Sequence, residues 1–208
     1  MAPEHPRELE LKYRLRGRKD YELLLENCLP APGRDPARLD NYYFDSSEYD
    51  IAAKGGMLRL RFDGDLKICF KLGGEKEGHP GYFDALEVES DLESGILQQA
   101  LDTPEILGEL PIRPITALWE HFDRLELTWV GQLSTVRRYR IIEPFLLELD
   151  EVTYPDGDVV FEVEIETSLP EEARKQLESR IKHLGIEAVP QRTSKLQGLL
   201  KRKGVFPF

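Results

Sequence analysis

The sequence predicts an α+β fold: a closed, mainly antiparallel eight-stranded β-barrel with helices packed on its outer face. Three observations lead to this prediction. About eight short runs alternate between apolar and charged residues, as β-strands with two different faces do. The charged faces carry far more acids and bases than an ordinary solvated face. Three or four amphipathic helices also need an apolar surface to cover, and the outside of a barrel supplies one.

We expect the barrel to close with its charged faces inward, because the helices must then cover the apolar faces on the outside. If the charged faces looked outward, the apolar faces would fill the interior and leave the helices little apolar surface to cover. With the charges inside, an eight-stranded barrel has room for one small ligand. Burying an unpaired ion costs several kcal/mol, so we expect a wet interior that holds a charged ligand.

The first strand, residues 7–16, shows this pattern most clearly. Two carboxylates come first on its polar face and cations follow, so that acids and bases are sorted along one line. An exposed face with charge pairs would explain this strand alone, but the recurrence of the pattern favours the barrel. The polar face carries Glu8, Glu10, Lys12, Arg14 and Arg16, and the apolar face carries Leu9, Leu11, Tyr13 and Leu15.

A helix, a strand and a short irregular segment come next. Residues 17–29 are predicted to be helical because Tyr21, Leu24 and neighbouring apolar residues lie on one face. The aromatic-rich run 38–45 is typical of a strand. Residues 46–53 are expected to form a loop or a turn of helix.

A hairpin of cations follows. Residues 57–62 and 66–72 alternate around the compact turn signal at 63–65, which predicts two paired strands. No acid interrupts the polar face of this hairpin, which carries Arg59, Arg61, Lys67 and Lys71. After a glycine-rich loop, residues 82–91 form another strand, with Glu87 and Glu89 on its polar face.

The second half of the chain continues the alternation of helices and charged strands. Two of its strands, 125–130 and 135–142, are expected to form a hairpin across Gly131 and Gln132. The other predicted elements are the strands 145–154 and 161–166 and the helices 93–101, 115–122, 170–184 and 194–203.

Composition limits the classes of function. The 208 residues are 32% charged and 40% apolar, without repeats or linkers, so we expect a single domain over residues 1–208. The net charge of −11 argues against a nucleic-acid backbone or an anionic membrane as partner. The first six residues have no apolar signal core, no apolar run approaches the ~18 residues of a membrane span, and two cysteines are too few for a disulfide scaffold. We therefore expect a cytoplasmic protein.

The side chains expected inside the barrel indicate phosphate chemistry. Clustered Arg and Lys suit a polyanion such as a phosphate chain, and clustered carboxylates suit hard divalent ions, Mg²⁺ or Mn²⁺. A site with both is typical of phosphoryl or nucleotidyl transfer. The expected interior set is Glu8, Glu10, Lys12, Arg59, Arg61, Lys67, Lys71, Glu148, Asp150, Glu162, Glu164 and Glu166, with at least one of Arg137, Arg138 and Arg140.

Several of these runs match the motifs of one family in order. Residues 8–12 read E-x-E-x-K, and residues 42–46 read Y-Y-F-D-S, where the family has Thr at the last position. The later matches are Leu58–Arg61, Ile68–Lys71, Glu148–Asp150, Glu164–Glu166 and Ser194–Leu196. On these motifs the chain resembles the CYTH superfamily, the triphosphate tunnel metalloenzymes that include class IV adenylate cyclases and thiamine triphosphatases. The resemblance implies an eight-stranded tunnel, a divalent-metal requirement and a triphosphate-containing substrate.

The resemblance also implies residue roles. Phosphates would be bound by Lys12, Arg59, Arg61, Lys71, Arg137 and Lys195. The metal would be bound by Glu8, Glu10, Glu148, Asp150, Glu164 and Glu166. Those expected to act in catalysis are Lys12, Arg59, Glu164 and Glu166. Arg137 and Arg138 point to opposite faces, and Arg137 is favoured without being decided. Lys67 has no firm counterpart in the family, and an ordinary exposed lysine explains it equally well.

Three functions stay open at this point. The leading hypothesis is a metal-dependent hydrolase of inorganic tripolyphosphate, thiamine triphosphate or a nucleoside triphosphate. The second is a class IV-type adenylate cyclase that makes cyclic AMP from ATP. The third is a non-catalytic polyphosphate-binding module. In each case the expected partner is a small triphosphate, and a homodimer is left open.

Overall fold

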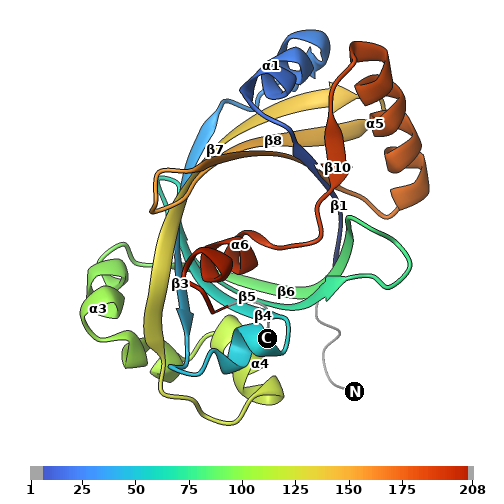
Figure 1. Ribbon diagram of the computed structural model, residues 1–208. Helices are drawn as coiled ribbons and strands as arrows, with labels where there is room; N and C mark the ends of the chain where they lie inside the picture. Colours follow the sequence, from blue (N-terminus) through green and yellow to red (C-terminus); the bar gives the residue numbers. More distant parts are fainter. Residues whose placement is uncertain (1–6, 206–208) are drawn as a thin grey trace.

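Eight antiparallel strands close into a barrel, as predicted (Figure 1). The computed structural model describes residues 7–205, and the ends of the predicted domain, residues 1–6 and 206–208, lie outside the described residues. The barrel strands are β1 (Arg7–Leu15), β3 (Ala37–Asp45), β4 (Gly56–Phe62), β5 (Leu66–Glu75), β6 (Tyr82–Leu92), β7 (Thr128–Ile142), β8 (Phe145–Thr153) and β9 (Val159–Glu166). Around the barrel they follow the order β1-β6-β5-β4-β3-β7-β8-β9, and β9 returns to β1.

Strand β1 closes the barrel because it pairs on both sides. Its first half pairs with β6, from Arg7 opposite Leu86 to Leu11 opposite Tyr82. From Glu10 onward it pairs with β9. Two short strands add to the outside of this ring: β2 (Leu29–Pro30) pairs with β7, and β10 (Ala188–Pro190) pairs with the end of β1.

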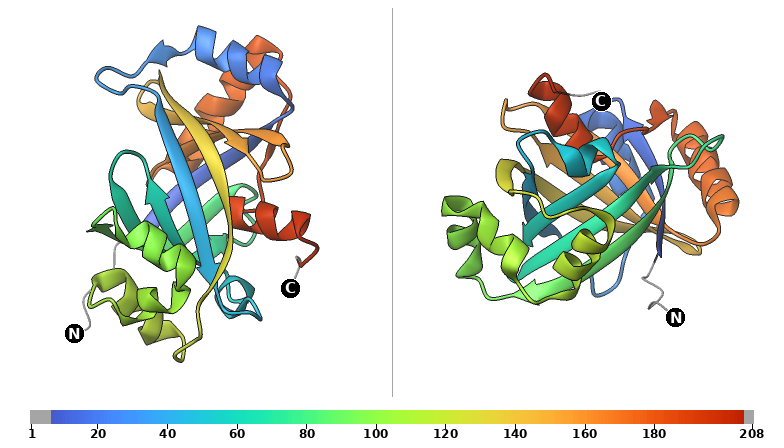
Figure 2. Two further views of the ribbon diagram at one scale, coloured as in Figure 1. Left: turned by 90° about the vertical axis from the view of Figure 1, so that its left-hand side faces the viewer. Right: turned by 90° about the horizontal axis from the view of Figure 1, so that it is seen from below.

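Helices cover the outer apolar face on two sides, also as predicted (Figures 1 and 2). Helices α1 (Arg18–Asn27) and α5 (Pro170–Leu184) pack over β1, β8 and β9, where Leu24 and Leu177 are fully buried. On the other side, α3 (Ile96–Asp102), the 3₁₀ helix η1 (Pro104–Glu109) and α4 (Arg113–His121) cover β4 to β6. The alternation read from the sequence therefore sorts the faces correctly: Leu58 and Leu60 are fully buried under these helices.

Helix α6 (Lys195–Arg202) is placed differently, because it lies across one mouth of the barrel (Figures 1 and 2). Its apolar residues Leu196, Leu199 and Leu200 pack against inward-facing side chains such as Tyr43 and Val152. The helix begins with a capping box, in which Ser194 and Gln197 satisfy each other's backbone N–H groups. The first turn of α6 is thereby fixed at the barrel interior.

One predicted hairpin is wrong. Residues 125–130 and 135–142 do not pair with each other, because β7 runs without reversal from Thr128 to Ile142 and pairs with β3 from Thr128 to Arg137. Gly131 has φ +150°, a conformation that favours glycine, and the pairing register shifts beside it between Tyr43 and Phe44. The glycine therefore marks a bulge within a long strand and not a turn.

No helix in residues 7–205 is long and apolar enough to cross a membrane.

Candidate functional site

The barrel encloses a cavity of about 320 Å³ that is lined largely by charged side chains. All six residues predicted to bind phosphate line it, although they come from β1, β4, β5, β7 and α6. These six cations are Lys12, Arg59, Arg61, Lys71, Arg137 and Lys195, Arg192 also lines the cavity, and the lining carboxylates from the predicted metal set are Glu8, Glu10, Glu148 and Glu164.

One side of the cavity is an acidic wall, made by carboxylates of β1, β8 and β9. Lys195 extends into it from α6: its Nζ lies 2.9 Å from Asp150 Oδ2, 3.0 Å from Glu162 Oε2 and 2.5 Å from Glu164 Oε1. Its ammonium group therefore already holds the position of a cation among three carboxylates. The acidic wall consists of Glu10, Glu148 and Glu164, which line the cavity, together with the buried Asp150 and Glu162, which do not line it.

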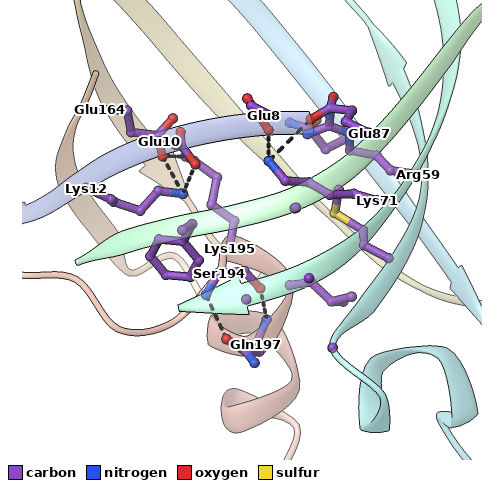
Figure 3. A pocket seen from close by; sticks show the side chains of 18 of the residues that line it. Glu8, Glu10, Lys12, Arg59, Lys71, Glu87, Glu164, Ser194, Lys195 and Gln197 are labelled. Atoms are coloured by element: carbon purple, nitrogen blue, oxygen red, sulfur yellow. Dashed lines mark hydrogen bonds and ion pairs between the residues drawn. The ribbon is translucent and has the colours of Figure 1, made fainter. Parts of the chain in front are cut away.

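Two further cations complete this network. Arg137 forms a bidentate pair with Asp150 through two contacts of 2.7 Å, and its Nη2 lies 2.8 Å from Glu164. It also pairs with Glu148. Lys12 Nζ lies 2.9 Å from Glu164 Oε1 and 3.3 Å from Glu10 Oε2 (Figure 3).

The acidic wall carries more negative charge than its own cations neutralise. Ion pairs within residues 7–205 bring three cations to its five carboxylates. Oxygen atoms of Asp150, Glu162 and Glu164 lie within 4.8 Å of one another. Hard divalent ions prefer such oxygen donors, and one ion would offset the excess negative charge. These residues therefore fit Mg²⁺ or Mn²⁺.

The excess charge also appears in the proton affinities. Burial, together with the neighbouring Glu164, raises the pKa of Glu10 to about 8. Burial has the same tendency at Glu164, but Lys12, Lys195 and Arg137 outweigh it and hold the pKa of Glu164 well below its usual range. At pH 7 the wall thus contains a firmly ionised carboxylate beside one that retains its proton.

The opposite side of the cavity is a cationic wall, formed by Arg59, Arg61 and Lys71 on β4 and β5. Lys71 Nζ pairs with Glu8 and lies 3.2 Å from Glu87 Oε2 (Figure 3). Arg61 Nη2 lies 3.0 Å from Glu89 Oε2.

The two arginines of the cationic wall keep donors available. The closest carboxylate to Arg59 is Glu87, at 4.0 Å. The Nε atoms of Arg59 and Arg61 are buried and have no hydrogen-bond partner within the described residues. Buried N–H donors without partners favour binding of an anion with several oxygens.

The motif at residues 42–46 holds the backbone segment that precedes β4, the strand that carries Arg59 and Arg61. The Asp45 carboxylate accepts hydrogen bonds from the backbone N–H groups of Ser46, Ile51 and Ala52, at 2.7 to 2.9 Å. These bonds hold the short helix α2 (Asp50–Ala53), which leads directly into β4. The Asp45 carboxylate therefore has a structural role: it holds α2 in place and so helps to position Arg59 and Arg61 on the strand that follows.

The sequence model of the CYTH domain matches residues 6–193, nearly the whole chain. The chain belongs to the CYTH domain family. This confirms the resemblance seen in the motifs. No curated protein matches the chain in sequence.

Solved structures share the CYTH fold of this chain. A candidate adenylyl cyclase from Hippeastrum, described as having a dominant triphosphatase activity, is 24% identical, with a TM-score of 0.83 over 96% of this chain and 97% of that one. A candidate adenylate cyclase from Bacillus halodurans is 22% identical, with a TM-score of 0.71 over 92% and 97% of the two chains. The protein PH1819 from Pyrococcus horikoshii is 19% identical, with a TM-score of 0.59 over 93% and 99%. These similarities concern the fold.

Within this CYTH barrel, Glu166 is not one of the three carboxylates whose oxygen atoms lie together. It lies exposed at the end of β9 and lines a second cavity of about 280 Å³ with Arg7, Arg34 and Glu148. Glu162 takes its place in the acidic wall, because Asp150 pairs in register with Glu162. Sequence reasoning put Glu162 on the inward face but did not include it in the metal set.

The CYTH barrel also shows which face of the sheet carries three residues whose position the sequence left open. Arg137 faces the cavity, whereas Arg138 lies on the outer face, where its Nη1 donates to the Tyr21 hydroxyl at 2.9 Å. Lys67 Nζ lies 3.3 Å from Glu89 and is not among the cavity-lining residues.

Glu87 and Glu89 are the residues that sequence reasoning left without a role. The sequence places both on the polar face of a predicted strand. It does not show which cations they contact, because that depends on the register between β5 and β6, in which Lys71 lies opposite Glu87.

Proposed function

We propose that the protein is a divalent-metal-dependent hydrolase of small triphosphate-containing molecules: inorganic tripolyphosphate, thiamine triphosphate or a nucleoside triphosphate. The observation that carries this proposal is the pairing of two walls across one cavity. A cationic wall with unpartnered arginine donors faces an acidic wall whose clustered carboxylates suit a divalent ion. Such a pair of surfaces suits a phosphate chain with a metal ion bound to it.

The chain's own residues would divide the work as follows. Arg59, Arg61 and Lys71 bind non-bridging phosphate oxygens and hold the chain of phosphates in one orientation. Lys12 and Arg137 contact the same cavity from the acidic side and stabilise charge that develops during transfer. Asp150, Glu162 and Glu164 would hold Mg²⁺ or Mn²⁺, which supplies Lewis-acid neutralisation of phosphate charge when bound.

The family and the fold neighbours support a triphosphate-related activity. The Hippeastrum protein is described as having a dominant triphosphatase activity, which favours hydrolysis for the present chain. The same protein and the Bacillus halodurans protein are also described as candidate adenylate cyclases, which favours the alternative, formation of cyclic AMP from ATP. We do not propose nucleic acids or anionic membranes as partners, because the net charge of −11 disfavours binding to polyanionic surfaces.

A phosphate-release screen tests the proposal. Purified protein is incubated with tripolyphosphate, thiamine triphosphate or ATP, with Mg²⁺, Mn²⁺ or EDTA, and the ATP samples are also analysed for cyclic AMP by HPLC. We expect metal-dependent phosphate release from at least one substrate and none in EDTA. A Glu164→Gln variant purified in parallel controls for contaminating phosphatases. Cyclic AMP as the dominant product would replace hydrolase by cyclase, and binding without any product would leave a polyphosphate-binding module.

A further inference from the structure

Two uncharged polar side chains face the cavity among its many charges. Asn41 on β3 and Thr135 on β7 line it and are 3% and 1% exposed. Ser194 and Gln197 also line the cavity, but they bind each other in the capping box of α6.

Asn41 and Thr135 present hydrogen-bonding atoms that the protein does not use. Asn41 Nδ2 donates to Leu39 O at 3.2 Å, so the amide nitrogen is used and the buried Asn41 Oδ1 is not. Neither Asn41 Oδ1 nor Thr135 Oγ1 has a hydrogen-bond partner within residues 7–205. Buried polar atoms are nearly always satisfied in native proteins, so a pair without partners in a ligand cavity indicates contact with a ligand.

The strand register brings this pair together and places it between two arginines. Leu39 lies opposite Thr135, so Asn41 and Thr135 are diagonal neighbours on one face of β3 and β7. Arg61 is the cross-strand partner of Asn41 on β4, and Arg137 follows Thr135 by two residues on the same face. The pair therefore adjoins the position where these arginines would hold a phosphate.

The chemistry of Asn41 Oδ1 selects what can bind here. An amide oxygen only accepts hydrogen bonds, and a deprotonated phosphate oxygen has no hydrogen to offer it. A water molecule or an alcohol does have one. The Thr135 hydroxyl can accept the second hydrogen of a water molecule or donate its own hydrogen to an alcohol oxygen, and in both cases a lone pair of the bound oxygen stays free.

We infer that Asn41 and Thr135 form a subsite that holds the attacking O–H group of the reaction. This inference rests on the proposed triphosphate chemistry and specifies where its nucleophile lies. The O–H group is a water molecule in hydrolysis, or the ribose 3′-hydroxyl if ATP is cyclised.

The reaction step at this subsite transfers one phosphoryl or nucleotidyl group. The bound oxygen forms a new bond to phosphorus while the bond from phosphorus to the bridging oxygen breaks. The electron pair of the broken bond stays with the departing phosphate, which takes up the proton of the O–H group. Asn41 and Thr135 orient the O–H group and do not change protonation.

Variants of the two residues test the subsite. Thr135→Val and Asn41→Leu remove the unpartnered atoms with little change of volume, and Thr135→Ser is the matched control because it keeps the hydroxyl. We measure the thermal midpoint without ligand, the dissociation constant for tripolyphosphate by calorimetry, and kcat and KM. Because the Thr135 hydroxyl binds nothing in the described protein, the unliganded midpoint of Thr135→Val should stay level or rise, whereas Asn41→Leu also loses the hydrogen bond from Nδ2 to Leu39 O. We expect kcat with tripolyphosphate to fall ~10- to 100-fold, with little change in the dissociation constant, and Thr135→Ser to retain the wild-type kcat.

The choice of substrate distinguishes the two sources of the O–H group. Tripolyphosphate has no organic hydroxyl, so a loss of kcat with it assigns the subsite to water. A loss confined to cyclic AMP formation from ATP, with tripolyphosphate hydrolysis unchanged, assigns it to the ribose hydroxyl. 3′-Deoxy-ATP then serves as the control that cannot be cyclised.

Two results would overturn the inference. The first is a lower unliganded midpoint in Thr135→Val, which indicates a structural hydrogen bond. The second is an unchanged kcat in both variants while the wild-type protein is active. Failure of the proposed hydrolase is a different result, namely a wild-type protein that releases no phosphate. If the wild-type protein makes cyclic AMP instead and the variants lose this activity, the subsite is supported although the hydrolase proposal fails.

Discussion

Lys195 and Asp150 form an ion pair of 2.9 Å in the acidic wall, although one begins the helix at the barrel mouth and the other lies in β8. Asp150 is fully buried, and its pKa is lowered because Arg137 and Lys195 outweigh the effect of burial. The position of α6 and the charge state of the acidic wall are thereby linked.

Lys195→Met should destabilise the unliganded protein by about 3–5 kcal/mol, because it leaves buried carboxylates with one cation fewer. The same change should increase the stabilisation by Mg²⁺, since the Lys195 ammonium occupies the place of a cation among Asp150, Glu162 and Glu164. Thermal unfolding over a range of Mg²⁺ concentrations measures both effects. Lys201→Met, an exposed change on the same helix, should alter neither. An equal stabilisation by Mg²⁺ in wild type and Lys195→Met would contradict the idea that Lys195 and Mg²⁺ compete for the same place.

Arg59→Ala should leave the unliganded protein at least as stable as wild type and weaken its stabilisation by tripolyphosphate. Arg59 has a distant carboxylate partner, Glu87, and that carboxylate keeps Lys71 at 3.2 Å when the guanidinium is removed. Differential scanning fluorimetry with and without tripolyphosphate checks this. Arg16→Ala, which removes an exposed arginine outside the cavity, serves as the control. An unchanged response to tripolyphosphate would remove Arg59 from the phosphate site.

Glu162→Gln and Glu164→Gln should raise the Mg²⁺ or Mn²⁺ concentration needed for half-maximal rate by ~10-fold or more, because each removes one anionic ligand from the acidic wall. Glu166→Gln makes the same chemical change on the same strand but outside that wall, so its metal dependence should match wild type. Rates at increasing metal concentration compare the three variants. A larger effect at Glu166 than at Glu162 would restore the metal set that the motifs imply.

In EDTA, stability should fall as pH rises from about 4.5 to about 8. The folded protein holds the Glu10 proton with a pKa of about 8, whereas the unfolded chain releases it near the ordinary value of 4.5. Between these values the folded state binds more protons, so raising the pH favours unfolding, and the contribution is constant above about 8. Glu164, whose pKa is lowered, loses its contribution only on acidification below this window. Urea unfolding at several pH values measures the slope, which should be shallower in Glu10→Gln. Parallel slopes for the two proteins would disprove this role of Glu10.

Strand faces were predictable from the sequence because side-chain alternation is local. Arg59 and Leu58 fall on opposite faces whatever the rest of the barrel does, and the structure agrees. The reversal predicted at Gly131 failed because a glycine permits a turn or a bulge equally. The partner strand decided between them: β3 pairs with β7 on both sides of Gly131.

The choice between Glu162 and Glu166 could not be made from alternation. Both lie on the inward face of β9, and a period of two does not say how deep in the barrel each residue lies. That depth depends on the register between β8 and β9 and on the position of Lys195, both of which are non-local. Lys195 itself was predicted as a phosphate-binding residue only through the family resemblance, since the amphipathic pattern of α6 indicates a covering helix without saying which surface it covers.

The double pairing of β1 has a consequence for how the chain folds. The strand made first during synthesis completes its hydrogen bonds only when the last barrel strand, β9, has been made. Once β7 or β8 has been added, the sheet still has two open edges, one on β1 and one on the most recent strand, and both can pair with other chains. Closing this ring joins residues from opposite ends of the sequence, which costs loop-closure entropy and slows folding. Strand completion therefore comes late in synthesis, and the newly made chain exposes open strand edges for longer than a helical protein of the same length would.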